Sequence, residues 1–211
     1  MMHELDKAVY SVYHKSTDRK LKTYTNLDIA IEGFYPGTLV EITGEPCSGK
    51  TSFVSRLFQT YVYKGIPCFV MNTSGEMEFL LSKNSKISKD KWNNAIFLDT
   101  SEEILSYVST LDVPCIVFID SILDLCLARE KEDEFFKELY NNILNKNIIV
   151  VFTNNIVGME KRGIWGTGPY GYNTFRSLIT TSICMKKKNG RFMAYVERHR
   201  YKRPACVDIT F

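Results

Sequence analysis

Runs of apolar residues alternate along most of the chain with segments in which apolar residues recur at helical spacing. The apolar, β-branched runs predict strands at 38–43, 67–72, 95–98, 114–119 and 147–153. The helical spacing predicts helices at 51–63, 75–83, 101–110 and 132–145. Apolar strands that alternate with amphipathic helices are typical of a parallel sheet covered by helices on both faces.

The pattern changes after residue 178, where strand-like runs follow at 180–186, 190–198 and 205–211. Asn189 and Gly190 separate the first two of these runs, and this dipeptide is typical of a tight hairpin turn. We therefore predict an α/β fold with a mostly parallel central sheet, flanking helices and antiparallel C-terminal strands.

The first 23 residues are mostly polar, and their only apolar cluster is Val9, Tyr10, Val12 and Tyr13. We expect residues 1–23 to form a lead-in and a possible interaction segment. This segment would lie on the core, which we place at residues 24–211, or on a neighbouring molecule.

The composition changes this picture little. A chain of 211 residues with 45% hydrophobic content suits one globular domain, and a net charge of +3 permits a local nucleic-acid surface without requiring one. The six cysteines, at 47, 68, 115, 126, 184 and 206, form no C-x-x-C pair, and several lie in apolar runs. We expect buried free thiols in a reducing compartment, with Cys47, which lies in the phosphate loop, as the exception.

The strongest motif is Gly44-Glu45-Pro46-Cys47-Ser48-Gly49-Lys50-Thr51, which matches the phosphate-loop pattern G-x-x-x-x-G-K-[ST] and continues through Ser52 into a predicted helix. Glycines at both ends let the backbone curl so that its N–H groups point inward, and the helix adds its positive N-terminal end. Lys50 is then expected against the β- and γ-phosphates of a bound polyphosphate, and Thr51 on Mg²⁺.

A carboxylate follows the predicted strand at 114–119. Asp120 ends this apolar run, and ligands of open α/β folds bind at the carboxyl ends of parallel strands. Because a phosphate loop precedes it in the chain, we predict that Asp120 holds Mg²⁺ together with Thr51.

Several motifs taken together resemble the ATPase core of RecA-type recombinases, especially the archaeal and eukaryotic branch. In chain order they are Leu27-Asp28, Gly33-Phe34, Gly37, Glu41, the phosphate loop, Asp120-Ser121, Val151-Phe152-Thr153-Asn154-Asn155 and Gly171-Tyr172-Asn173. The resemblance covers residues 23–211. It implies a RecA-like P-loop NTPase fold, use of ATP and Mg²⁺, and association with DNA and with other RecA-like subunits.

Three features depart from the family pattern. The family's catalytic glutamate is replaced by Ser74, so Glu76 is our candidate base, approaching from a different angle. Asn155 stands where the family has a longer glutamine that senses the γ-phosphate. We find neither the family's N-terminal DNA-binding domain nor an F-x-x-A segment. These losses resemble those of recombinase paralogues, including RadB-like proteins, and imply weak or absent hydrolysis.

The segment 156–173 is our candidate nucleic-acid element, and we expect it to be a mobile loop. It contains five glycines together with Lys161, Arg162, Trp165, Tyr170 and Tyr172. Basic groups neutralise phosphates, and flat rings stack on exposed bases. Arg176 follows it in a helix-like turn. The alternative is a surface loop whose aromatic residues pack on their own domain.

Two further basic segments lie near the C-terminus. We interpret Lys186-Lys187-Lys188 as a solvated hairpin tip. The denser cluster, residues 198–204, contains Arg200 and Lys202. By resemblance these two residues reach the ATP of a neighbouring subunit, and a second DNA-backbone patch is the alternative. We expect His199 to be partly exposed, and we predict no structural metal.

We therefore expect an ATP-binding recombinase paralogue that assists homologous recombination or DNA repair. It would be intracellular, nuclear in a eukaryote and cytoplasmic in an archaeon, with no membrane association. One alternative is an active DNA-dependent ATPase or strand-exchange protein with Glu76 as its base. The other is a nucleotide-binding scaffold of the same fold outside DNA metabolism.

Overall fold

A computed structural model describes residues 20–73, 75–84, 91–111, 113–122, 132–161, 164–169, 175–199 and 202–209. Within them nine strands form one sheet: β1 Thr38–Gly44, β2 Cys68–Asn72, β3 Ala95–Leu98, β4 Cys115–Asp120, β5 Ile148–Lys161, β6 Ile164–Pro169, β7 Ile179–Lys188, β8 Arg191–His199 and β9 Ala205–Ile209. The order is β3-β2-β4-β5-β1-β7-β8-β9, parallel from β3 to β7 and antiparallel from β7 to β9, with β6 paired to β5. The predicted α/β fold is confirmed.

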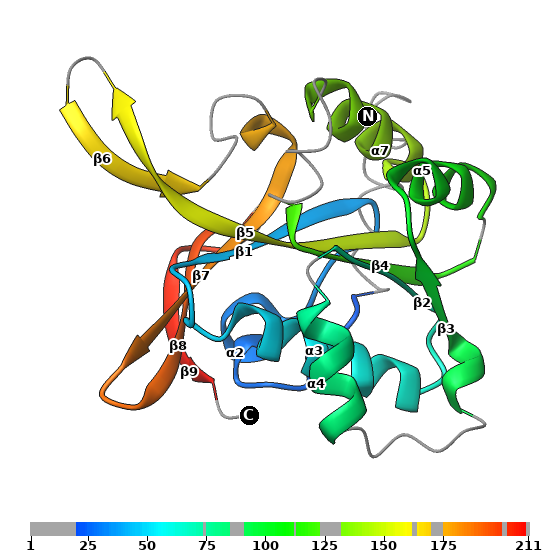
Figure 1. Ribbon diagram of the computed structural model, residues 1–211, viewed down its shortest axis with the longest axis horizontal. Coiled ribbons are helices and arrows are strands. Elements are labelled where there is room, and N and C mark those ends of the chain that lie inside the picture. The colour runs from blue at the N-terminus through cyan, green and yellow to red at the C-terminus, as the bar shows by residue number, and fades with distance from the viewer. Residues whose placement is uncertain are drawn as a thin grey trace, which may run out of the picture.

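Helices cover both faces of this sheet (Figure 1). The described helices are α2 Leu27–Ile31, α3 Lys50–Tyr63, α4 Glu76–Asn84, α5 Ser101–Thr110 and α7 Glu132–Ile143, with 3₁₀ turns η1 Lys91–Asn94 and η2 Arg176–Leu178. On one face lie α2, α3 and α4, and on the other lie α5 and α7. None of the described helices is long and apolar enough to cross a bilayer.

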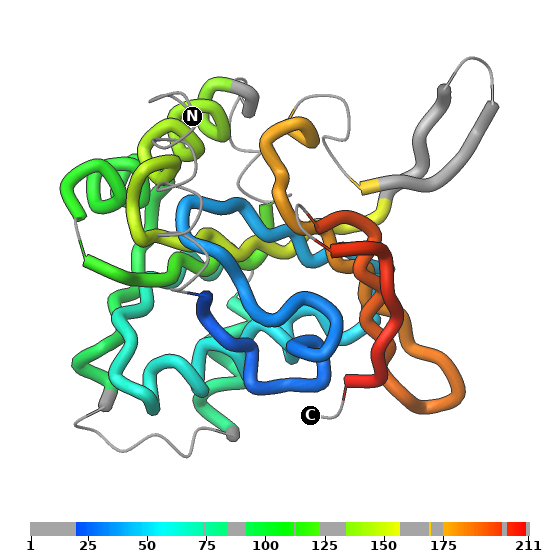
Figure 2. The backbone as a smooth tube through the Cα atoms, turned by 180° about the vertical axis from the view of Figure 1, so that it is seen from behind, coloured from blue at the N-terminus to red at the C-terminus, as the bar shows by residue number. Residues whose placement is uncertain are grey.

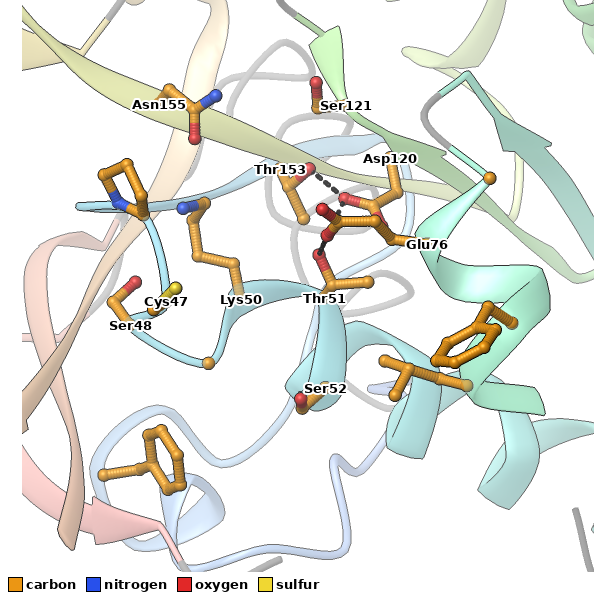
Figure 3. A pocket seen from close by; sticks show the side chains of 16 residues that line it. Cys47, Ser48, Lys50, Thr51, Ser52, Glu76, Asp120, Ser121, Thr153 and Asn155 are labelled. Carbon is orange, nitrogen blue, oxygen red and sulfur yellow. Dashed lines mark hydrogen bonds between the residues drawn. The ribbon is translucent and has the colours of Figure 1, made fainter. Parts of the chain in front are cut away.

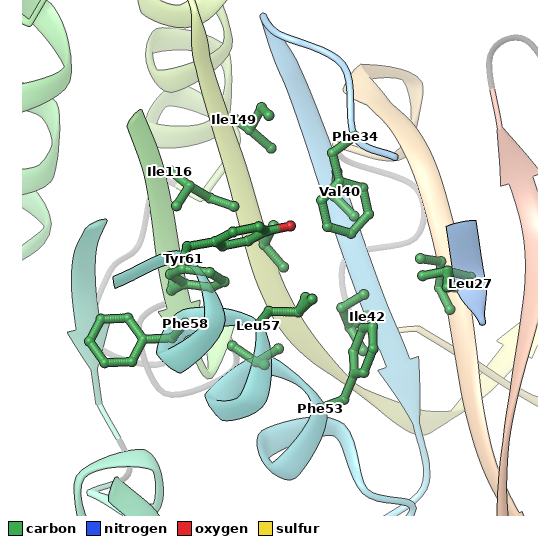
Figure 4. Packing of buried hydrophobic residues seen from close by; sticks show 14 of the residues in the cluster. Leu27, Phe34, Val40, Ile42, Phe53, Leu57, Phe58, Tyr61, Ile116 and Ile149 are labelled. Carbon is green, nitrogen blue, oxygen red and sulfur yellow. The ribbon is translucent and has the colours of Figure 1, made fainter. Parts of the chain in front are cut away.

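The core has one layer on each side of the sheet. On the first, Phe53, Leu57 and Tyr61 recur along α3 and pack on Val40 and Ile42 of β1 (Figure 4). The side chains of α3 that follow this spacing are fully buried, as the helical periodicity predicts. The packing holds the N-terminus of α3 at the end of β1.

The second layer is built from α5, α7 and η2. Phe136 of α7 stacks on Phe175, just before η2, with ring centroids 4.1 Å apart. Helix α5 begins at a capping box, in which Thr100 and Glu103 each bond the other's backbone N–H. This capping box fixes the start of α5 at Ser101, where the sequence predicted it.

The prediction of a loop over 156–173 is wrong in the part of it that the structure describes, because residues 156–161 and 164–169 are paired strands. Strand β5 continues to Lys161 and pairs with β6 as an antiparallel hairpin. Its parallel pairing with β1 ends at Asn155. Beyond that point the backbone groups of β5 need another partner, and the returning strand supplies it.

The C-terminal strands form the predicted hairpin. Asn189 and Gly190, with φ of 52° and 76°, have the positive φ values that a tight hairpin turn requires. Figure 2 shows the segment around α2 beside β9, where the Asn26 side-chain amide donates to the Asp208 carbonyl at 3.1 Å. The charge run at 186–188 is exposed, as interpreted.

Two smaller expectations are corrected. His199 is buried, 8% exposed, because it packs on Tyr35 with ring centroids 5.6 Å apart. Cys206 is exposed on β9, an edge strand, as Cys47 is in the phosphate loop. The other described cysteines, Cys68, Cys115 and Cys184, are buried, and Cys126 lies outside the described residues.

Candidate functional site

The carboxyl ends of β1, β2, β4 and β5 meet at a cleft of about 860 Å³ (Figure 3). Its lining consists of Pro46, Cys47, Ser48, Gly49, Lys50, Thr51, Ser52, Gly75, Glu76, Phe79, Leu80, Asp120, Ser121, Thr153, Asn155 and Phe192. A volume of this size is typical of small-molecule sites. Strand order brings these segments together, since β4 and β5 lie between β2 and β1.

Two glycines determine the shape of the phosphate loop. Gly44 and Gly49 have φ of 152° and 93°, values that other residues rarely adopt. A Cβ on Gly44 would lie 2.4 Å from the Ser48 Oγ, and one on Gly49 would lie 2.7 Å from the Phe192 ring. The loop can therefore close tightly only with glycine at both positions.

Lys50 begins α3 and reaches back across the loop. Its ammonium donates to the carbonyls of Gly44 and Glu45, both at 3.0 Å. Burial lowers the pKa of Lys50, and the negative charges of Asp120 and Glu76 oppose that shift. The arrangement places a cation over the phosphate loop (Figure 3).

Asp120 is held at the end of β4 by two hydroxyls. The Thr153 hydroxyl donates to its Oδ1, and the Thr51 hydroxyl lies 3.5 Å from the same atom. Burial raises the pKa of Asp120, and these hydrogen bonds counteract the effect. Its Oδ2 is buried and has no hydrogen-bond partner among the described residues.

The residues around Asp120 fit a magnesium ion. Mg²⁺ prefers oxygen ligands and is commonly held by one or two carboxylates together with substrate phosphates. The unpartnered Oδ2 of Asp120 and the hydroxyl of Thr51 are such oxygens, and both lie beside the phosphate loop.

Glu76 and Asn155 approach this centre from two sides. Glu76 begins α4, and its Oε2 lies 3.4 Å from the Thr51 hydroxyl. Asn155 stands opposite Gly44 in the β1–β5 register and lines the cleft. The structure thus brings both predicted catalytic candidates to the cleft that contains the phosphate loop.

Several residues that line the cleft were not predicted as site residues: Ser121, Thr153, Phe79, Leu80 and Phe192. Ser121 directly follows β4, and Thr153 lies within β5 beside Asp120. Their place near the carboxyl edge of the parallel strands was the signal that could have found them. Phe79 lies one turn into α4. No local signal marks Phe192, because it arrives from the antiparallel hairpin.

The other predicted site residues that the structure describes do not line the cleft. Lys161 and Trp165 belong to the β5–β6 hairpin, whereas Arg162, Tyr170, Tyr172, Arg200 and Ser74 are outside the described residues. Arg176 begins η2, and its carbonyl accepts a hydrogen bond from Arg198 at 2.7 Å. The ammonium of Lys202 bonds Glu32.

Comparisons with known proteins agree with this geometry. The family model described as "ATPase family associated with various cellular activities (AAA)" matches residues 40–162, which is more than half of the chain. No curated protein sequence matches.

The fold is also found in solved structures. A RadB recombinase is 21% identical with a TM-score of 0.70, covering 89% of this chain and 94% of its own. A KaiC-like protein from Pyrococcus horikoshii OT3, a hyperthermophilic archaeon, is 20% identical with a TM-score of 0.64, covering 90% and 93%. The RecA-like P-loop fold expected from the sequence is confirmed.

Proposed function

The chain belongs to the ATPase family associated with various cellular activities (AAA), and from this premise we propose that it binds Mg-ATP in the cleft around the phosphate loop. The observation that carries the proposal is the buried Oδ2 of Asp120, which lacks a partner among the described residues and lies beside the Thr51 hydroxyl. A buried, unpaired carboxylate oxygen is costly unless a cation accompanies it.

Each side chain has a distinct task in this proposal. Lys50 offers its ammonium to the β- and γ-phosphates, and the N–H groups of the loop bind phosphate oxygens. Thr51 and Asp120 hold Mg²⁺, which neutralises charge on the phosphates when bound. Glu76 is the candidate base, and Asn155 is the candidate sensor of the γ-phosphate.

Calorimetric titration of ATP in the presence of Mg²⁺ tests this site. Lys50→Ala should weaken ATP binding about tenfold or more, because a charge-assisted contact to phosphate is lost. Lys22→Ala, at an exposed lysine outside the cleft, is the matched control. ATP affinity that Lys50→Ala leaves unchanged would contradict this placement of the phosphates.

We propose further that the protein is a recombinase paralogue that assists DNA repair and hydrolyses ATP slowly. The sequence motifs, together with similarity to a RadB recombinase along nearly the whole chain, support this role. Its partners would be single-stranded DNA and other RecA-like subunits. The similarity to a KaiC-like protein supports a second candidate function, that of a nucleotide-binding scaffold outside DNA metabolism.

Oligonucleotide binding separates these two functions. A paralogue should bind labelled single-stranded DNA with an affinity that falls steeply as salt rises, whereas absence of binding at ~50 mM salt would remove the DNA role. Replacing Lys161 and Arg162 with alanine should reduce the salt slope by about one to two, and Trp165→Ala should weaken binding by about 1–3 kcal/mol.

Lys202 allows a test of the two alternatives for the C-terminal basic cluster. If Arg200 and Lys202 reach ATP in a neighbouring subunit, Lys202→Ala should abolish ATP-dependent association and leave DNA affinity unchanged. If they bind the DNA backbone, the same variant should weaken DNA binding and leave association intact. Sedimentation with and without ATP measures the first effect, and fluorescence anisotropy measures the second.

A further inference from the structure

An apolar groove of about 490 Å³ lies at the edge of the sheet opposite the nucleotide cleft. It is lined where the chain enters the parallel strands, by Leu21, Pro36, Gly65, Ile66, Pro67, Val113, Pro114, Cys115, Asn147 and Ile149. The phosphate loop and Asp120 lie at the carboxyl ends of these same strands. The groove is therefore separate from the nucleotide site.

The chemistry of the groove suits an apolar occupant. Three of its lining residues are prolines, which have no backbone N–H, and most of the others are aliphatic. Val113 on its rim is 49% exposed. An apolar segment laid along the groove would remove this surface from water, which is the main favourable contribution to such docking.

The described chain starts at the rim of this groove. Leu21 lines the groove and is fixed by two backbone hydrogen bonds with Phe34, both 2.8 Å long. Beside it, the Lys20 ammonium bonds Glu32 at 2.6 Å. Residues 1–19 therefore join the core at a fixed point next to the groove.

The sequence of that segment matches the groove. Residues 8–13, Ala-Val-Tyr-Ser-Val-Tyr, contain no charged side chain, whereas Lys7 and Lys15 lie on either side. Tyr13 precedes Leu21 by eight residues, and a linker of that length can span up to about 27 Å. The apolar stretch is thus close enough to reach the groove from its anchor.

We infer that residues 8–13 dock in the apolar groove of their own chain. The tether decides between this chain and a second copy, since a linker of a few residues gives the segment an effective concentration at the groove of about millimolar order. A second copy in dilute solution is present at far lower concentration. The sequence left open whether the N-terminal segment lies on its own core or on a neighbouring molecule. Under this inference it lies on its own core.

Photo-crosslinking of the full chain tests the docking. With benzoylphenylalanine in place of Tyr10, irradiation should join this residue to 65–67 or 113–115 within a single chain, as read by mass spectrometry of the monomer band. Val113→Glu should reduce the yield about tenfold or more, because a carboxylate disfavours an apolar occupant. Ile29→Glu, at an apolar residue 82% exposed on α2, is the matched control and should leave the yield unchanged.

Three outcomes would overturn the inference. They are crosslinks confined to a dimer band, crosslinks to other parts of the core, and a yield that does not respond to Val113→Glu. A second measurement avoids groove variants altogether. Replacing Tyr10 and Tyr13 with aspartate should speed amide hydrogen exchange at 113–116, and unchanged exchange would also overturn the docking. Both experiments are done without nucleotide, so they do not depend on ATP binding.

Discussion

The hydroxyl of Thr51 lies 3.5 Å from Oδ1 of Asp120, although 69 residues separate them in the chain. Thr51 is in the first turn of α3 and Asp120 ends β4. Their meeting joins the phosphate loop to the carboxylate at the neighbouring strand ends. The predictions for nucleotide binding depend on this pair.

Removing the charge of Asp120 should uncouple ATP from magnesium. Asp120→Asn is expected to lower ATP affinity about tenfold or more with Mg²⁺ and to change it little in EDTA, because one anionic ligand of the ion is lost. Calorimetry under both conditions measures this, with Asp99→Asn at an exposed carboxylate as the control. Equal losses with and without Mg²⁺ would argue against a magnesium ligand.

The same substitution should stabilise the metal-free protein. Burial raises the pKa of Asp120 above its usual value, so the folded state holds this proton more tightly than the unfolded state does. At neutral pH the ionised carboxylate therefore costs folding free energy. In EDTA at pH 7 the melting temperature of Asp120→Asn should exceed that of the wild type, and this difference should shrink as pH falls below the raised pKa.

Glu76 decides whether the protein is an active ATPase. A slowly hydrolysing paralogue should show turnover far below the ~1 s⁻¹ of ordinary enzymes, with or without single-stranded DNA, and Glu76→Gln should change it little. Phosphate release assays with Glu78→Gln, an exposed neighbour, as control would check this. Turnover near ~1 s⁻¹ that collapses on Glu76→Gln would instead support the DNA-dependent ATPase.

Glu41 links three strands inside the sheet. Its Oε1 accepts from the Asn154 amide and its Oε2 from the Ser182 hydroxyl, both at 2.9 Å, and burial raises its pKa. Glu41→Ala should lower the free energy of unfolding by about 3 kcal/mol, because two buried donors lose their acceptor. Glu41→Gln, which keeps the shape, should cost less. Urea unfolding measures the stability of both variants. If Glu41→Ala is as stable as the wild type, these hydrogen bonds contribute little.

His199 should make the fold acid-sensitive. Burial, aided by the positive charge of Lys202, lowers the pKa of His199 to about 4, against 6.5 in the unfolded chain, while Glu32 opposes the shift. The unfolded state therefore takes up the proton first, so stability is lost as pH falls from 6.5 towards 4. The loss attributable to this residue is up to about 3 kcal/mol.

A substitution isolates this contribution of His199. His199→Phe keeps a ring against Tyr35 and removes the titrating group. Urea unfolding at pH 7 and pH 4.5 should therefore show a smaller loss of stability for His199→Phe than for the wild type. Identical losses would assign the acid sensitivity to other groups.

The sequence by itself determined the local features of this protein. The phosphate loop can be predicted from the sequence because two glycines at fixed spacing permit backbone angles that other residues rarely adopt, with φ of 152° and 93°. The hairpin turn can be predicted for a similar reason, since Asn189 and Gly190 both tolerate the positive φ values that it requires. Helix α3 follows from the spacing of its apolar residues.

The tertiary structure decided everything that depends on the order of strands across the sheet. Apolar periodicity predicts that a strand is buried but not which strand lies beside it. The contact of Thr153 with Asp120 and that of Phe192 with Gly49 therefore could not be predicted from the sequence. The burial of His199 and the extension of β5 into a hairpin have the same origin. Each depends on a partner distant in sequence, and no local pattern carries that information.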